Sequence, residues 1–358
     1  MADESAYWKV AGLRQLDRLL LALNELALAR DERIRVFLEW ASSISPRDLA
    51  PDARLTNLDF TANPAAPPDL LLSTRIFLNR VVLSGHQMQP SVRSKSDFAE
   101  RIAAVRDDWI ASAPAEGWEY LETPAQIPDC ERRFLRRSGK AHDGLVSRFL
   151  NRPVSRALTR ILLRFPITPS AWTLSIFVLP ILGSMFLARG SYGNVIIGLL
   201  VFQLYSILDG CDGEIARAKY LESARGRRLD TWCDVIGNLF LVLALGYGLS
   251  RPVEAVFVAI LIATNEIVLA LAPASTRPLP AASVSSAVYP RHQQLLERSG
   301  LLFIGPRFTG WLIHLTKRDV ALLFFVFLAL AGQSAWILHL LGAVAAISTL
   351  LALKARSR

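Results

Sequence analysis

The chain has 358 residues, of which 52% are hydrophobic and 20% charged, and its formal net charge is +9. Three cysteines form no disulfide framework, and no zinc-finger or helix-turn-helix spacing supports a nucleic-acid partner for the positive charge. With long apolar runs present, anionic lipid or a phosphorylated substrate is the expected partner. The first ten residues, MADESAYWKV, contain no apolar stretch of the kind that a cleaved signal peptide requires.

Roughly the first 140 residues are mixed and polar, whereas the remainder carries the apolar runs. A length of 358 residues is sufficient for two domains. We therefore expect a small soluble α/β or α+β domain over residues 1–130. Its expected elements are a helix over 12–29, a strand or helix over 33–40, a strand over 69–80 and a helix over 96–112.

Residues 131–165 are expected to form a linker and a juxtamembrane helix that begins near Asn151 and Pro153. An apolar stripe and a row of arginines at every fourth residue follow different sides of this helix. The arginines are Arg148, Arg152, Arg156, Arg160 and Arg164. One interpretation is an amphipathic helix in the plane of the membrane interface, with its arginines toward lipid headgroups. In the alternative, arginines such as Arg152 face an active site and bind a substrate phosphate.

Six apolar stretches over residues 166–358 predict an all-α polytopic membrane bundle, because each is long enough to cross a bilayer or nearly so. The shortest, the fifth, requires an extension back to about Lys317. The expected spans are 167–188, 192–208, 229–249, 253–272, 320–332 and 334–353.

Four aspartates lie at the end of the second span and the start of the third, in the spacing D-x2-D-G-x2-A-R-x8-G-x3-D-x3-D. Asp209 and Asp212 share one helical face, and Asp230 and Asp234 share a face of the next helix. If the two helices are antiparallel neighbours joined by residues 218–225, the four carboxylates converge. Their mutual repulsion and the cost of charge near a membrane favour hard divalent cations such as Mg²⁺.

At all eight fixed positions this spacing matches the signature of the CDP-alcohol phosphotransferase family, which the chain resembles. The resemblance implies an integral membrane enzyme that moves a substituted phosphate group from a CDP-alcohol donor to an acceptor hydroxyl and releases CMP. It further implies that Asp209, Asp212 and Asp230 hold two Mg²⁺ or Mn²⁺ ions. Asp234 is implied to touch the second ion and to act as the general base.

The same resemblance implies contacts to the donor nucleotide or its phosphates. Glycines let a ligand approach the backbone, and an arginine fork suits phosphate. Relatives tend to have T-P-N-x-x-T at the start of the first span, whereas this chain has Ser170 in place of the asparagine. The implied donor contacts are Ser170, Thr173, Gly213, Ala216, Arg217, Ser223 and Gly226. Lys317 and Arg318 are expected either to bind an acceptor phosphate or to anchor the fifth span at the interface.

Residues 131–165 are also similar to the linker of one branch of the family, the di-myo-inositol phosphate phosphate synthase type. That branch carries an N-terminal nucleotidyltransferase-like domain, which needs a Gly-rich, basic phosphate loop near its start. The corresponding stretch here has only Gly12. We therefore expect a truncated, inactive relic or a docking module. A CDP-diacylglycerol donor with a polyol acceptor is the commonest type in the family, whereas the linker points to inositol-phosphate chemistry.

Positive charge gathers in residues 217–228, in the 275–318 connection and in the C-terminal tail. By the positive-inside rule, the signature and both termini are expected on the cytoplasmic side of the cell membrane. Relatives tend to be dimers, so a homodimer is one expected assembly. Two other classes stay open: a transporter, since intramembrane acids can mark an ion pathway, and a non-catalytic membrane scaffold or nucleotide-binding relic.

Overall fold

The computed structural model describes residues 1–42, 52–62, 68–78, 97–112, 117–137, 146–270 and 318–356. The chain forms two compact units. The first comprises Met1–Ser138 together with two short segments, Leu163–Pro166 and Ala218–Tyr220. The second comprises Gly139–Leu162, Ile167–Arg217 and Leu221–Arg358.

In the first unit a short 3-10 helix (Glu4–Tyr7) is followed by a tight β-hairpin, which occupies the start of the predicted helix. Strand β1 (Lys9–Val10) pairs antiparallel with β2 (Leu13–Arg14), and Ala11 and Gly12 make the turn with φ angles of 46° and 83°. Two consecutive positive φ angles define the type I′ turn that suits two-residue hairpins. The helix expected over 12–29 therefore starts later, as α1 (Gln15–Arg30), because residues 12–14 complete the hairpin.

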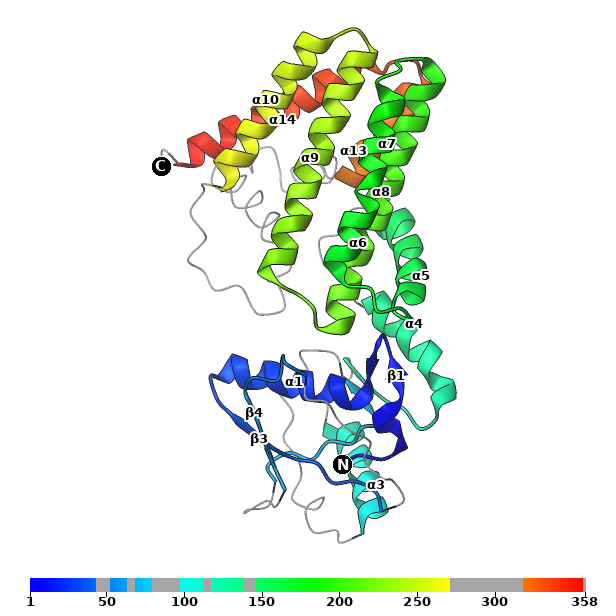
Figure 1. Ribbon diagram of the computed structural model, residues 1–358, viewed down its shortest axis with the longest axis vertical. Coiled ribbons are helices and arrows are strands. Elements are labelled where there is room, and N and C mark those ends of the chain that lie inside the picture. Colours follow the sequence, from blue (N-terminus) through cyan, green and yellow to red (C-terminus); the bar gives the residue numbers. More distant parts are fainter. Residues whose placement is uncertain are drawn as a thin grey trace. The chain divides into compact units, whose positions relative to one another are not determined.

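Among its described residues, the first unit also contains two further strand pairs and two further α-helices; β3, β4, α3 and α4 are labelled in Figure 1. Strand β3 (Ile34–Phe37) runs parallel to β4 (Leu58–Thr61), and β5 (Ile76–Leu78) runs antiparallel to β6 (Trp118–Tyr120). Helices α3 (Phe98–Ser112) and α4 (Ile127–Arg137) follow β5 and β6 in the chain. Mixed strands and helices confirm the expected character of this region. Of the strand predicted over 69–80, only 76–78 is extended in a ladder, and residues 79–80 lie outside the described residues.

Apolar side chains from α1, β5 and α3 form the core of the first unit. The ring of Tyr220, from the short segment 218–220, packs in this same core. Trp109 of α3 is fully buried and makes an edge contact with Trp118 of β6. The first unit thus builds part of its core from a residue far along the chain.

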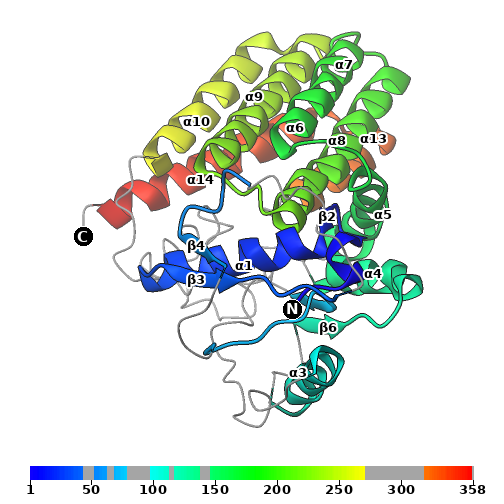
Figure 2. The ribbon, with the colours of Figure 1, turned by 60° about the horizontal axis from the view of Figure 1, so that its bottom comes forward.

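The second unit is helical in the residues described. Its helices are α5 (Arg152–Leu162), α6 (Pro169–Ile176), α7 (Val178–Leu187), α8 (Tyr192–Lys219), α9 (Ala224–Gly248), α10 (Pro252–Ala270), α13 (Arg318–Leu330) and α14 (Ala335–Arg356). Helix α9 lies between α7 and α10, and α14 packs against α10 (Figure 2). Leu199 and Phe202 of α8, Leu245 of α9 and Phe325 of α13 contribute to a common apolar core.

Three helical stretches of the second unit are long and apolar enough to cross a membrane: Pro169–Leu187, Tyr192–Lys219 and Ala224–Gly248. Three of the six expected spans are thereby supported among the described residues. The first is divided into α6 and α7 at Phe177. Pro180 explains the division, since it lacks the N–H that would bond the carbonyl of Ile176. Helix α8 continues past the expected end at Leu208 to Lys219, which makes the first half of the signature helical.

Helix α5 is amphipathic, but its polar side faces inward. Arg152, Ser155 and Thr159 are buried, whereas Val154 and Ile161 are exposed. The interpretation that the arginines point to lipid headgroups is therefore wrong at Arg152. The reason is a buried partner on α8: Arg152, Ser155 and Thr159 all bond to the carboxylate of Glu214.

Candidate active site

Helices α8 and α9 bring three of the four predicted aspartates together. Asp209 and Asp212 lie one turn apart on α8, and Asp230 lies in the second turn of α9. Each offers a carboxylate oxygen, and the three oxygens lie within 4.8 Å of one another. The i, i+3 spacing places the two α8 carboxylates on one face, as expected. We call these three residues the aspartate cluster.

The aspartate cluster fits a hard divalent cation. All three residues are partly buried, and one oxygen of Asp209 is fully shielded with no hydrogen-bond donor among the described residues. Shielded carboxylates held this close repel one another, and an unsatisfied buried acceptor costs about 1–3 kcal/mol. Oxygen ligands from carboxylates are the set that Mg²⁺ and Mn²⁺ prefer. The donor set therefore suits these ions.

Asp234 lies one turn beyond Asp230 on α9 and has partners of its own. Its carboxylate forms an ion pair with Arg318, the first residue of α13, and accepts a hydrogen bond of 3.4 Å from the hydroxyl of Tyr205. The Arg318 guanidinium lies 4.8 Å from the centre of the Tyr205 ring. Tyr205, four residues before Asp209, was missed from the sequence, although the i, i+4 spacing places it on the aspartate face of α8.

The start of α6 contacts the signature helix. Thr168 caps α6 by accepting a hydrogen bond from the backbone N–H of Ala171. The hydroxyl of Thr173 donates to Asp212 Oδ2 at 2.7 Å, and the indole N–H of Trp172 donates to the carbonyl of Leu208 at 3.0 Å. The T-P-S-x-x-T segment therefore supports an aspartate of the cluster directly.

Two signature glycines are closely approached by polar side chains. A Cβ at Gly213 would lie 3.2 Å from Arg217 Nη1, and a Cβ at Gly226 would lie 3.1 Å from Ser223 Oγ and 3.8 Å from Ser170 Oγ. Ser223 caps α9 by accepting a hydrogen bond from the backbone N–H of Gly226 at 2.9 Å. The structure thus brings Ser170, Ser223 and Gly226 together, and it folds Arg217 over Gly213.

The remaining predicted residues are placed differently. Ala216 is buried within α8. Lys317 lies outside the described residues, whereas Arg318 opens α13. Arg152 is directed at a carboxylate that the sequence did not single out: its Nη1 lies 3.1 Å from an oxygen of Glu214.

Glu214 occupies a variable position of the signature and is 1% exposed. Besides Arg152, its carboxylate accepts hydrogen bonds from Ser155 Oγ at 3.0 Å and from Thr159 Oγ1 at 2.7 Å. Glu214 thus fixes α5 against α8. Its position two residues after Asp212 turns it away from the aspartate face, which is the one sequence signal that separates it from the cluster.

Residues 167–353 match the family described as CDP-alcohol phosphatidyltransferase, and the match spans just over half of the chain. The chain belongs to this family. It is accordingly a membrane transferase of a family that uses divalent metal ions, a CDP-alcohol donor and an alcohol acceptor, in agreement with the apolar helices and the aspartate cluster.

Among proteins of known function, the chain is similar to several named "Bifunctional IPC transferase and DIPP synthase". It is 36% identical over 143 residues to that of Rubrobacter xylanophilus, covering 39% of this chain and 31% of the relative. The relative from Thermococcus kodakarensis is 33% identical over 147 residues, covering 40% and 33%. The relative from Archaeoglobus fulgidus is 31% identical over 141 residues, covering 38% and 28%. The similarity spans about a third of these relatives and confirms the predicted branch.

Proposed function

We propose that the protein transfers a substituted phosphate group from a CDP-alcohol to an acceptor hydroxyl in inositol-phosphate-type biosynthesis, with release of CMP. The observation that carries the proposal is the aspartate cluster, built from α8 and α9 at the positions of a complete family signature. The linker resemblance favours inositol-phosphate chemistry, and the relatives named "Bifunctional IPC transferase and DIPP synthase" belong to the same branch. We therefore assign CDP-inositol as the donor and an inositol phosphate as the acceptor. A CDP-diacylglycerol donor with a polyol acceptor is the competing pair.

In this proposal Asp209, Asp212 and Asp230 hold Mg²⁺ or Mn²⁺, and Asp234 contributes to the second ion. The closeness of the three carboxylates, and the shielded oxygen of Asp209 that has no donor among the described residues, support this assignment. When bound, two such ions supply charge stabilisation for the donor diphosphate and the leaving CMP. The protein's own contribution is to hold the three carboxylates on two helices whose ends are joined by residues 220–223 alone.

Asp234 is the proposed general base. Its carboxylate takes the proton of the acceptor hydroxyl as the acceptor oxygen bonds to the phosphorus next to the donor alcohol. The bond from that phosphorus to the oxygen of CMP breaks, and CMP leaves. Proton transfer by a positioned side chain contributes about 10²–10⁴-fold. Tyr205 and Arg318 support the role, since both contact Oδ1 and so orient the carboxylate while leaving its other oxygen to the acceptor.

We assign donor binding to the side chains that surround Gly213 and Gly226. Arg217 beside Gly213 offers a planar donor fork to a phosphate. The Ser223 hydroxyl already accepts a hydrogen bond from Gly226, so its own O–H is available to donate to an oxygen of the nucleotide or diphosphate. Ser170 lies beside Gly226 and occupies the position where relatives tend to have asparagine.

For the acceptor phosphate we favour Arg318 over Arg152. Arg318 lies against Asp234, so a phosphate on it would place the neighbouring acceptor hydroxyl near the base. Arg152 is buried and neutralises Glu214. Lys317 is retained as a second candidate contact next to Arg318. We further propose six membrane spans, a cytoplasmic active site and a homodimeric assembly.

The test is CMP release by the purified protein in detergent with Mg²⁺ or Mn²⁺. The donors are CDP-inositol and CDP-diacylglycerol, each offered with inositol phosphate, inositol and glycerol phosphate. We expect metal-dependent release with CDP-inositol and inositol phosphate. Asp234→Asn keeps the size of the side chain but removes the base, so we expect a loss of at least about 10²-fold.

Asp107→Asn is the matched control, because Asp107 is an exposed residue of α3. It should leave CMP release unchanged. Turnover with CDP-diacylglycerol alone would replace the substrate assignment, and full activity in Asp234→Asn would overturn the base assignment. Nucleotide binding without turnover by any pair would favour the scaffold or relic.

A further inference from the structure

Within the first unit, two arginines from the N-terminal region bond to the chain at 218–220. The guanidinium of Arg18, on α1, donates to the carbonyls of Val10 and Ala218, each at 3.0 Å. Arg18 is 1% exposed, and its guanidinium lies 4.7 Å from the ring centre of Phe77 and 5.8 Å from that of Tyr220. A buried guanidinium between a carbonyl and aromatic faces is held in one place.

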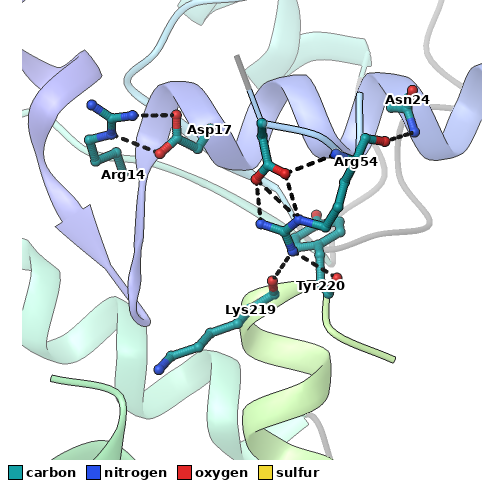
Figure 3. Close-up of polar contacts among 7 residues, drawn as sticks. Arg14, Asp17, Asn24, Arg54, Lys219 and Tyr220 are labelled. Carbon is teal, nitrogen blue, oxygen red and sulfur yellow. Dashed lines mark hydrogen bonds and ion pairs between the residues drawn. The ribbon is translucent and has the colours of Figure 1, made fainter. Parts of the chain in front are cut away.

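Arg54 bonds to the next two residues. Its Nη1 donates to the carbonyl of Lys219 at 2.8 Å and to that of Tyr220 at 2.9 Å (Figure 3). The opposite side of the guanidinium is held by Asp52 at 2.6 Å. The hydrogen bonds from Arg54 hold the pKa of Asp52 below its ordinary value. Asn24 of α1 donates to the backbone carbonyl of Arg54 at 3.0 Å, which fixes the segment itself.

The three carbonyls belong to the end of α8. The last carbonyls of a helix have no partner within it and carry the negative end of its dipole. Here Tyr220 adopts a left-handed conformation with φ of 56° and ends the helix. Guanidinium groups thus bind the carbonyls of Ala218, Lys219 and Tyr220 in succession, and this arrangement suits both the polarity and the hydrogen-bonding need of the helix end.

The β-hairpin fits against the same residues. A Cβ at Gly12 would lie 2.8 Å from Cε of Lys219 and 3.0 Å from the carbonyl oxygen of Leu163. The ammonium of Lys219 in turn donates to the carbonyl of Phe165 at 2.7 Å. A side chain at the hairpin turn would therefore displace Lys219. The position where a nucleotidyltransferase needs a phosphate loop is instead a tight turn that receives the end of α8.

We propose that the N-terminal unit acts as a positioning clamp for the corner between the two signature helices. The clamp consists of Arg18, Arg54 and Asp52 with the carbonyls of residues 218–220. Arg217 directly precedes these carbonyls, and Ser223 begins the next helix four residues after Lys219. Fixing the corner therefore sets the donor contacts on either side of it. The region needs no nucleotide chemistry of its own to serve the reaction.

Arg54→Ala tests the clamp. Arg14→Ala is the matched control, because Arg14 also forms an ion pair, with Asp17 at the start of α1, but makes no bond to residues 218–220 in Figure 3. In the full-length protein, we expect faster hydrogen exchange at the amides of 218–226 in Arg54→Ala. The KM for the donor should rise about tenfold, the scale of a lost hydrogen bond to a charged group. The acceptor KM should not change, and Arg14→Ala should match the wild type.

A merely structural role would lower the active fraction and hence kcat, with the donor KM unchanged. Arg54→Lys retains the charge but not the fork and should lie between the wild type and Arg54→Ala; it also replaces Arg54→Ala if that variant does not fold. If the amides of 218–226 exchange hydrogen at the wild-type rate in both Arg54→Ala and Arg54→Lys, the clamp is wrong. The kinetic arm rests on the proposed function, whereas the exchange arm does not. If the wild type shows no turnover but hydrogen exchange at 218–226 still depends on Arg54, the proposed function is wrong and the clamp is supported.

Discussion

Two sides of α8 carry carboxylates with opposite surroundings. On one side, Glu214 receives Arg152, Ser155 and Thr159 and is satisfied by the protein itself. On the other side, Asp209 and Asp212 face Asp230, and an oxygen of Asp209 has no donor among the described residues. The two sides belong to one helix and lie less than two turns apart.

The difference separates a structural carboxylate from the proposed ligand site. Burial alone does not distinguish them, since Glu214 is the more deeply buried. What distinguishes them is whether the protein supplies the compensating charge and donors. A buried charge that has its partners fastens two helices together. The three carboxylates of the aspartate cluster lie close together, and an oxygen of Asp209 has no donor among the described residues, so we propose that a cation compensates their charge. The predictions below alter one side of α8 at a time.

The largest effect is expected from Asp209→Asn on the cation side. The asparagine removes the negative charge of Asp209, which we propose binds the cation. CMP release should therefore fall by about 10³-fold, the scale on which loss of charge stabilisation acts in an active site. Mn²⁺ should raise the thermal unfolding temperature of the wild type, because it binds only the folded protein. That rise should disappear in Asp209→Asn. An unchanged response to Mn²⁺ would remove Asp209 from the cation site.

On the Glu214 side of α8, Arg152→Ala should lower the stability of the fold. It leaves the Glu214 carboxylate buried without its charge partner, which typically costs about 3–5 kcal/mol. The measurement is thermal unfolding in detergent, where the unfolding temperature should fall while the increment produced by Mn²⁺ persists.

The double variant Arg152→Met with Glu214→Leu supplies the control, since an apolar pair of similar volume should recover most of the lost stability. If Mn²⁺ no longer raises the unfolding temperature of Arg152→Ala, the two sides of α8 are not independent. An unfolding temperature equal to that of the wild type would show that Glu214 finds other compensation.

The aspartate face could be predicted because spacing alone determines it. Helical periodicity places Asp209 and Asp212 together, and the apolar run before them indicates a helix long enough to carry both. The family signature then identified Asp230 on the following helix. Residues 218–225 were expected to form a turn, whereas α8 extends to Lys219 and the connection is shorter. Helix ends depend on partners such as Arg54, which lie far away in the sequence.

The inward direction of α5 could not be predicted, for a related reason. Its sequence has an apolar side and a basic side, and periodicity does not say which side meets the protein. The answer depends on Glu214, which is distant in the sequence and lies inside a motif whose four aspartates lie on other faces of the helices. The hairpin before α1 was missed because Leu13 and Leu16 fit a helical pattern that begins at Gly12, whereas the conformation of Ala11 and Gly12 reverses the chain first.

The smallest effect is expected from Thr173→Val, which alters how one ligand of the cation side is held. Thr173 is buried, and its hydroxyl donates to Asp212. Removing a hydrogen bond to a ligating carboxylate typically costs about 10–100-fold in metal affinity, and we expect the lower end because Asp209 and Asp230 remain. Mn²⁺ titrations of CMP release should show a raised half-saturating concentration with nearly normal activity at saturation. Ser175→Ala is the control, since the Ser175 hydroxyl bonds the carbonyl of Ala171 on the same helix. Thr173→Ser should restore the wild-type titration. If Thr173→Val titrates normally, the aspartate cluster is held by its helices alone, and α6 serves the donor rather than the cation.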